Sequence, residues 1–160
     1  MGNNNLIIRK AEKKDILRIG ELLGQVNRIH HDIRPDLFKI GRKYSESDLE
    51  EIINDPERPV FCAIDVESGT LVGYCMTELT KTDDAIRTKM KTIYIDDLCV
   101  DEKCRGKHAG SALYEAVADF GRQNGFYNST LHVWEGNDKA KAFYEAMGMK
   151  TMYTCLEEIL

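Results

Sequence analysis

The sequence predicts a single α/β (α+β) domain in which one mixed sheet carries helices on its faces. The 160 residues are the length of one domain with a proper core. Strand-like and helix-like runs follow each other in the order β-α-α-β-β-β-α-β-α-β, with a hairpin at the centre. A doubly wound parallel sheet would alternate strands and helices more strictly, so the mixed sheet is favoured.

The first part of the chain is predicted to hold one strand and two helices. Apolar residues at helical spacing indicate the first helix, and a capping box that begins at Ser47 indicates the second. Arg34-Pro35-Asp36 interrupts the helical pattern, and the residues around it, 32–44, are loop-like. The expected ranges are 6–9 for the strand, 13–29 and 47–54 for the helices, and 1–5 for a disordered leader.

The second part begins with the hairpin. Residues 60–66 and 71–79 are rich in strand-forming side chains and are separated by Glu67-Ser68-Gly69-Thr70, a turn-forming sequence. The polar residues 81–90 follow as a flexible connection. Beyond them we expect strands at 92–100, 130–134 and 149–157, a strongly amphipathic helix at 111–123 and a short helix at 138–147.

Composition and charge exclude several classes of function. The net charge of −5 argues against a nucleic-acid partner, because nonspecific duplex binding needs a basic surface; it leaves room for a cationic substrate. No apolar run approaches ~20 residues, so no membrane span is expected. The N-terminus lacks the apolar core of a signal peptide, which favours a cytoplasmic protein.

The cysteines also favour a cytoplasmic protein. There are five, an odd number, and no two of them form a CxxC pair. Most lie in apolar strand-like runs, which is typical of reduced thiols in a cytoplasmic protein. No Cys and His residues cluster at ligand spacing, so we expect no metal site.

The most informative stretch is residues 94–111, YIDDLCVDEKCRGKHAGS. A β-rich run ends at Val100, and a helix is expected to begin near Ser111. The turn between them, RGKHAG, presents free backbone N–H groups and the positive end of a helix dipole, and so forms a ready anion site. Gly106 and Gly110 let the backbone approach a ligand closely. The spacing matches neither GxxxxGKS/T nor GxGxxG.

This turn resembles the acyl-coenzyme A loop of the GNAT superfamily of N-acetyltransferases, R/Q-x-x-G-x-G/A. Arg105 and Gly110 match its ends, whereas His108 stands where the family usually has its first glycine. If φ is positive there, histidine is costly. Residues 134–149 resemble the family's closing motif, N-x-x-A/S-x-x-F/L-Y-x-x-x-G-F/M. The positions on pattern are Asn137, Ala140, Phe143, Tyr144, Gly148 and Met149.

The resemblance covers nearly the whole chain and implies one N-acetyltransferase domain over residues 1–160. The implied fold is a mixed, mostly antiparallel six- to seven-stranded sheet flanked by about four helices. The implied activity is direct transfer of an acetyl group from acetyl-CoA, the cosubstrate, to a primary amine, with no metal. The acceptor is expected to be a small polyamine- or aminoglycoside-like amine, and the relatives make a homodimer possible.

Acetyl transfer requires a deprotonated amine, a polarised carbonyl and a departing thiolate that is stabilised or protonated. The resemblance implies that the Tyr144 hydroxyl lies near the sulfur, and tyrosine is a suitable acid for a thiolate of pKa ~8–9. Asp96 matches an acid of polyamine and aminoglycoside acetyltransferases, and is the candidate base or substrate anchor. Because Asp96 and Asp97 are consecutive in a strand, we expect them on opposite faces, with only one facing the cleft.

The resemblance also implies a binding set, in which the strand end pairs with pantetheine and the turn holds the diphosphate. The expected coenzyme-binding residues are Leu98, Cys99, Val100, Arg105, Gly106, Lys107, His108, Ala109, Gly110, Ser111, Asn137 and Tyr144. The expected substrate-binding residues are Asp96, Phe38, Glu78 and Trp134, with Glu135 and His132 as further candidates. Residues 29–38 would form a lid over the acceptor site, with Phe38 as its anchor.

Structural interpretations stay open beside these roles. The turn, taken alone, is compatible with an exposed helix start, and Tyr144 is compatible with a core aromatic residue. The two aspartates are compatible with a solvated pair or a salt bridge, and residues 29–38 with a simple connection between helices. The alternative functions are a protein N-terminal or lysine acetyltransferase and, from another class, a noncatalytic CoA-binding regulatory module. A route through the thiol of Cys99 or Cys104 lacks an activating base nearby in sequence.

Overall fold

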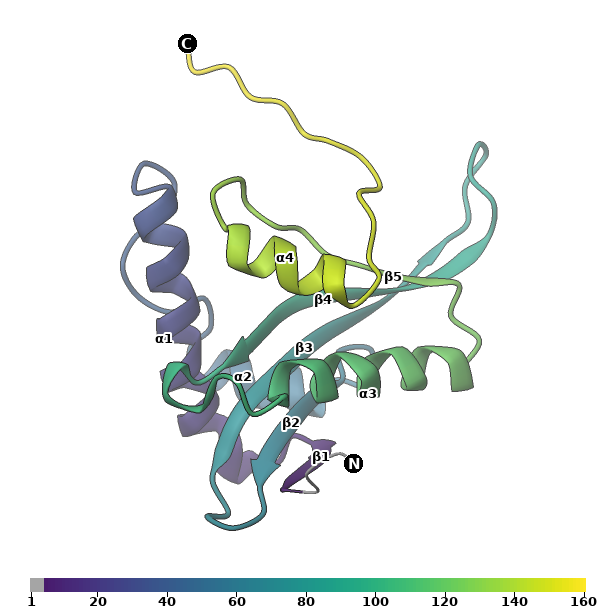
Figure 1. Cartoon of the computed structure of the whole chain (residues 1–160). Helices are drawn as coiled ribbons and strands as arrows, with labels where there is room; N and C mark the ends of the chain where they lie inside the picture. The colour runs from purple at the N-terminus through teal and green to yellow at the C-terminus, as the bar shows by residue number, and fades with distance from the viewer. Residues whose placement is uncertain (1–4) are drawn as a thin grey trace.

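The computed structural model describes residues 5–160 and contains one five-stranded sheet in the order β1-β2-β3-β4-β5 (Figure 1). The elements are β1 (Leu6–Lys10), η1 (Lys13–Asp15), α1 (Ile16–Ile33), α2 (Glu46–Asn54), β2 (Val60–Asp65), β3 (Leu71–Thr82), β4 (Met90–Val100), η2 (Glu102–Cys104), α3 (Ala109–Gln123), β5 (Asn128–Thr130) and α4 (Asp138–Ala146). The expected leader lies outside the described residues except for Asn5, whose carbonyl accepts a hydrogen bond from the Val66 N–H at 2.8 Å.

The sheet is mixed, as the sequence predicts. Strands β1 to β4 pair antiparallel with their neighbours, and β5 is parallel to β4. The parallel pair is joined through α3, which crosses one face of the sheet (Figure 1). The predicted fold class is therefore confirmed.

Two apolar clusters, one on each face, hold the helices to the sheet. On one face α1 and α2 bury Leu22 and Leu49 against side chains that include Tyr74 and Cys99. On the other face α3 buries Leu113 against a cluster that includes residues 93 and 95 of β4. Each buried Leu or Ile stabilises the fold by roughly 1.5–3 kcal/mol relative to an exposed one. The side of the sheet covered by α1 and α2 is the α1 face, and the side covered by α3 is the α3 face.

The number of strands differs from the prediction of six to seven. Residues 149–157, expected as the last strand, pair with no strand in the described chain and run out as an exposed tail (Figure 1). A strand requires a ladder partner, and apolar tail residues such as Leu156 and Ile159, at 90% and 80% exposure, contact no core of this chain. Strand β5 is also shorter than expected, at residues 128–130 in place of 130–134.

The cap of α2 was also misplaced by the sequence pattern. Ser45, not Ser47, is the N-cap. Its hydroxyl accepts a hydrogen bond from the Asp48 N–H, and the Asp48 carboxylate accepts one from the Ser45 N–H. Both serines have an acid three positions on, Asp48 after Ser45 and Glu50 after Ser47, so the pattern fits either, and the structure uses the first. Helix α1 continues to Ile33, beyond the expected residue 29.

Candidate active site

The site begins where β5 diverges from β4. These two strands pair only from Thr92 opposite Asn128 to Tyr94 opposite Thr130. From Ile95 to Val100, β4 has no strand beside it on that side within residues 5–160, although its other edge stays paired with β3. The predicted residues Leu98, Cys99 and Val100 thus lie on a strand with one open backbone edge, with which an extended amide can pair.

The basic turn leads from this open edge into α3. Arg105, Gly106, Lys107 and His108 are exposed, and α3 begins at Ala109. The N–H groups of its first turn have no partner inside the helix, which makes this end an anion site. His108 adopts φ +60° and ψ +15°, the left-handed conformation. The positive φ that would make a histidine costly at this position of the motif is therefore present.

Helix α4 packs against the start of α3. A Cβ on Gly110 would lie 3.3 Å from the Phe143 ring, so the glycine permits this close contact. Asn137 caps α4, with its side-chain oxygen accepting from the Ala140 N–H at 3.4 Å. Tyr144 is half-buried beside Phe143, with ring centroids 5.0 Å apart. Two parts of the predicted site, the turn and the helix with Tyr144, are thus in direct contact.

Burial raises the pKa of Tyr144 well above its usual value, and nearby acidic groups that include Asp97 add to this rise. The phenol therefore stays protonated throughout the physiological range. Asp97 and Cys99, both on β4, are among these groups, so the Tyr144 hydroxyl lies within the electrostatic reach of that strand.

A β-bulge at Asp96 changes the faces of β4. Met76 lies opposite Asp97 and Thr77 opposite Ile95, so Asp96 is the extra residue on β4. Before the bulge, Ile95 belongs to the cluster on the α3 face; after it, Cys99 belongs to the cluster on the α1 face. Asp96 and Asp97 therefore both lie on the α1 face. The expectation that they point to opposite faces is wrong, because strict alternation does not continue through a bulge.

The Asp96 carboxylate is held by the loop between α1 and α2. Its Oδ1 lies 2.5 Å from the Lys43 Nζ, and its Oδ2 accepts a hydrogen bond from the Tyr44 hydroxyl at 2.8 Å. The Asp96 side chain is 7% exposed and that of Lys43 49%. Asp96 is thus a nearly buried carboxylate that binds a primary ammonium, and sequence reasoning missed both of its partners, which are more than fifty positions away.

The network continues to Glu78. The Tyr44 hydroxyl also accepts from the Arg58 guanidinium at 3.1 Å, and Arg58 pairs with Glu78 at 3.2 Å. The predicted substrate residue Glu78 is therefore paired to Arg58, which links it through Tyr44 to Asp96. Sequence analysis passed over Arg58 because nothing local marks it.

Asp97 has a different environment from that of Asp96. Its Oδ2 accepts a hydrogen bond from the buried Tyr74 hydroxyl at 2.7 Å. Burial raises the pKa of the Asp97 carboxyl to about 6; the Tyr74 bond opposes this rise, and the neighbouring Asp96 charge adds to it. A carboxyl of this kind can exchange a proton near neutral pH.

The loop after α1 and the loop after β5 meet at two aromatic rings. The Phe38 ring lies edge-on to Trp134 at 5.2 Å, and the Phe38 carbonyl contacts His31 Nδ1 at 2.7 Å. The predicted lid anchor and the predicted substrate residue Trp134 are therefore in contact. The residues of the segment that reach Asp96 lie further on, at 43 and 44, outside the predicted lid 29–38.

His132, a further candidate, joins β4 to the C-terminal tail. Its Nδ1 is 2.9 Å from the Tyr94 hydroxyl, and its Nε2 is 2.7 Å from the Tyr153 hydroxyl. Burial raises the pKa of Tyr94, and the Asp96 charge adds to the rise. Tyr94 and Asp96 thus influence each other on one face of β4. Glu135 lies exposed in the loop that precedes α4.

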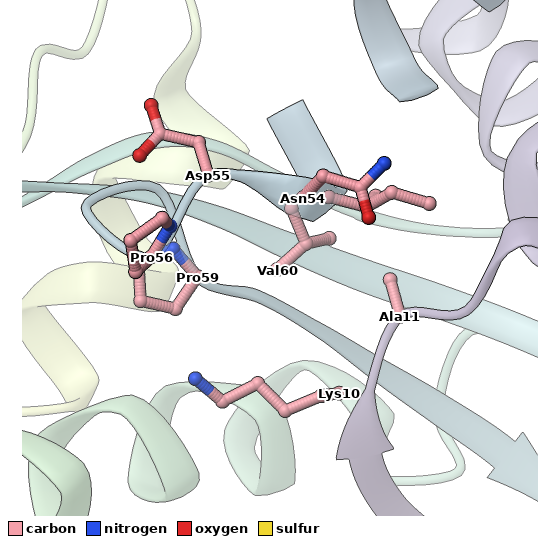
Figure 2. Close-up of a pocket in the computed structure, with 8 residues that line it drawn as sticks. Lys10, Ala11, Asn54, Asp55, Pro56, Pro59 and Val60 are labelled. Carbon is pink, nitrogen blue, oxygen red and sulfur yellow. The ribbon is translucent and has the colours of Figure 1, made fainter. Parts of the chain in front are cut away.

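Two further features take no part in these polar contacts. The Cys99 thiol is buried toward the Leu22 carbonyl at 3.6 Å, and burial raises its pKa to about 12. A shallow pocket lies where β1 and β2 approach the end of α2, with Lys10, Asn54, Pro56 and Pro59 around it (Figure 2). It contains none of the predicted site residues.

Comparison with known proteins decides the family. Residues 26–149 match the model of the acetyltransferase (GNAT) family. The chain is a GNAT acetyltransferase. It is 32% identical over 142 residues to an uncharacterized N-acetyltransferase, YhfO, of Bacillus subtilis, a match that covers 88% of this chain and 87% of the relative.

Solved structures agree with this GNAT assignment. A crystal structure of a mutant of the BH1408 protein from Bacillus halodurans is 31% identical, covers 96% of this chain and 99% of its own, and superposes with a TM-score of 0.92. Glucosamine-6-phosphate N-acetyltransferase from Arabidopsis thaliana is 25% identical, with 96% and 97% covered and a TM-score of 0.70. The family match confirms the predicted enzyme class. GNAT acetyltransferases use acetyl-CoA as cosubstrate.

Two further properties of this GNAT enzyme concern residues 5–160. None of their helices has the length and apolar character that crossing a bilayer requires. Over the same range, no three or more His, Cys, Asp or Glu side chains are arranged to hold a metal ion.

Proposed function

We propose that this acetyltransferase moves the acetyl group of acetyl-CoA directly to the primary amine of a small cationic acceptor, of polyamine- or aminoglycoside-like chemistry. The observation that carries the proposal is the contact between Lys43 and Asp96. A primary alkylammonium already occupies the Asp96 carboxylate, on the α1 face of the strand that has the open edge. The acceptor amine is expected to take the same position.

The coenzyme would lie along β4 and the start of α3. The open edge of Leu98 to Val100 offers backbone groups to the pantetheine amides, and the first-turn N–H groups of α3 fit a diphosphate. Arg105 and Lys107 add positive charge beside this end. Gly110 keeps the backbone free of a side chain, and Asn137 and Tyr144 border the far side through α4. These residues fit acetyl-CoA in both charge and backbone geometry.

The reaction then needs one proton acceptor and one proton donor. Asp96 binds the ammonium, takes its proton and leaves a neutral amine that can attack the thioester carbonyl. Tyr144, whose hydroxyl is protonated at neutral pH, donates to the departing thiolate. Asp97 holds a second negative charge next to Asp96, which strengthens the attraction for a cationic amine. Phe38, Trp134 and Glu78 would line the acceptor side.

Direct transfer is favoured over a thiol intermediate. The raised pKa of Cys99 keeps its thiol protonated, and its sulfur faces the α1 backbone on the buried side of the sheet. An effective nucleophile would require the thiolate.

A lysine side chain of a protein or peptide is the second candidate acceptor. The specific observation in its favour is that the group on Asp96 is itself a lysine. A small amine and a lysyl peptide present the same ammonium, and they differ in the room that the acceptor side must provide.

The test is a thiol-release assay with acetyl-CoA against a panel of polyamines, aminoglycosides, amino sugars and lysyl peptides. We expect turnover with a cationic primary amine and at least a hundredfold loss of kcat/KM in Asp96→Asn, because anchor and base are lost together. Lys39→Gln, in the same loop and away from Asp96, is the matched control. Tight binding of acetyl-CoA without turnover on any amine would support a noncatalytic binding module in place of the proposal.

A further inference from the structure

We propose that Lys43 is a site of intramolecular acetylation, and that its modification frees Asp96 for the acceptor. The inference rests on the proposed function, because the group transferred to Lys43 is the acetyl group of the same acetyl-CoA. It adds a modification site and a form of self-regulation to that function.

The geometry places a substrate-like group at the substrate position. The Lys43 Nζ lies 2.5 Å from Asp96 Oδ1, and Tyr44 occupies the other carboxylate oxygen at 2.8 Å. The carboxylate proposed to bind the acceptor is thus fully engaged by groups of its own chain. Lys43 is a primary alkylamine, so it belongs to the acceptor's own chemical class. Its four-carbon side chain is flexible, which lets the amine move a short distance toward the thioester carbonyl carbon.

Lys43 differs from the other lysine of its loop. Its ammonium also lies over the Tyr44 ring, at 5.2 Å from the centroid, and its side chain is half-exposed. Lys39, four positions earlier, is exposed, and the Lys39 backbone carbonyl accepts from the Asn27 side chain at 2.7 Å. The two lysines therefore share sequence context and solvent access but not the contact with Asp96. Lys39 is the internal control for nonspecific acetylation.

The transfer step balances without another reagent. Asp96 takes a proton from the Lys43 ammonium, and the neutral amine attacks the thioester carbonyl carbon. A C–N bond forms, the C–S bond breaks, and Tyr144 protonates the thiolate. Loss of the second amine proton to solvent leaves an amide. Burial lowers the pKa of Lys43, but Asp96 and Tyr44 together raise it by more, so the neutral amine is scarce and the step should be slow and faster at higher pH.

Acetylation would change what Asp96 can bind. An amide carries no charge, so acetyl-Lys43 cannot pair with the carboxylate, and one oxygen of Asp96 becomes free for an incoming ammonium. The unmodified enzyme would compete with its own acceptor for this carboxylate. The enzyme would therefore bind its acceptor better after one internal turnover.

The first experiment incubates the full chain with acetyl-CoA alone and follows acetylation of individual lysines by peptide mass spectrometry. We expect Lys43 to be modified at least tenfold faster than Lys39, at a fractional rate that does not depend on protein concentration. An excess of a turned-over amine should suppress the modification. Equal rates at both lysines, or a rate that rises with protein concentration, would overturn the proposal.

The second experiment measures acceptor kinetics in variants at position 43. Lys43→Gln imitates the acetylated state and should lower KM about two- to fivefold, the range expected when one partly exposed ion pair no longer competes. Lys43→Arg keeps the charge and should leave KM near that of unmodified wild type. An unchanged KM in Lys43→Gln would contradict the competition. If an added amine is acetylated and Lys43 is not, this inference alone is wrong. If neither the amine nor Lys43 is acetylated, the proposed function is wrong as well.

Discussion

Asp96 and Asp97 lie on the same face of β4, although they are consecutive in the strand. The bulge opposite Met76 and Thr77 is the reason. It brings two carboxyl groups to the α1 face, one bound to Lys43 and Tyr44 and the other to Tyr74. Two adjacent carboxyl groups of unequal surroundings give one site both an ammonium anchor and a group with a pKa near neutrality.

The first prediction concerns stability and Asp97. Its pKa is about 6 in the folded chain and 3.8 in an unperturbed one, so between these values the folded state binds more protons than the unfolded state. Stability from this group is therefore present below pH ~4 and is lost as pH rises through ~6, by up to about 3 kcal/mol. Asp97→Asn keeps an acceptor for Tyr74 and should abolish this component.

Urea unfolding of wild type and Asp97→Asn from pH 4 to pH 7 measures the effect. The advantage of the variant in unfolding free energy should grow over this range. The comparison cancels the contributions of other carboxyl groups, such as Asp101, whose pKa is lowered chiefly by the Lys103 N–H and whose stabilisation is lost at lower pH. A difference that stays constant with pH would show that Asp97 titrates normally.

Most of the fold could be predicted because its signals are local. The amphipathic pattern of α3, the hairpin turn and the motif around Asn137 each depend on residues close in sequence. The bulge was not predicted, because strict alternation through IYIDDL places Asp97 on the face of Ile93 and Ile95, and only pairing with β3 reveals the extra residue. The strand predicted at residues 149–157 is wrong for the opposite reason. Its composition is typical of a strand, but no neighbouring strand in the described chain pairs with it.

The positions of the candidate residues divide in the same way. The turn and Tyr144 followed from motifs, and the structure brings them together through Gly110 and Phe143. The surroundings of Asp96 did not follow, because Lys43 and Tyr44 reach it from a loop with no regular pattern. Contacts over such sequence separations depend on how α1 and α2 pack on the sheet, which no short motif encodes.

The second prediction concerns His108. At φ +60°, a side chain costs about 1–2 kcal/mol relative to an ordinary conformation, and glycine avoids that strain at some cost in chain entropy. His108→Gly should therefore raise the free energy of unfolding by about 0.5–1 kcal/mol. His108→Val should lower it, because a β-branched side chain tolerates this conformation least.

Denaturant unfolding of the three proteins, with acetyl-CoA titration by calorimetry, checks this prediction. Coenzyme affinity in His108→Gly should equal or exceed that of wild type, since the backbone N–H is retained. A weaker affinity in this variant would mean that the imidazole itself contacts the ligand.

The third prediction compares two helical glycines. A Cβ at Gly110 would lie 3.3 Å from Phe143, whereas at Gly24, in α1, nothing lies within 4 Å. Gly110→Val should displace α4, cost about 1–3 kcal/mol of stability and weaken acetyl-CoA binding. Gly24→Ala should instead stabilise the chain by about 0.5–1 kcal/mol through helix propensity and leave binding unchanged. Equal effects at both positions would show that the contact with Phe143 does not set the position of α4.

The last prediction isolates the Tyr144 hydroxyl. Tyr144→Phe keeps the ring beside Phe143, so folding and acetyl-CoA affinity should stay within about twofold of wild type, while kcat should fall about 10²- to 10⁴-fold as expected for loss of a general acid. Tyr127→Phe, at an exposed tyrosine beyond α3, is the control. Because a better leaving thiolate needs less protonation, an acetyl donor with a more acidic thiol should recover more activity in Tyr144→Phe than in wild type. Equal recovery in both enzymes would mean that the hydroxyl positions the coenzyme and does not protonate its sulfur.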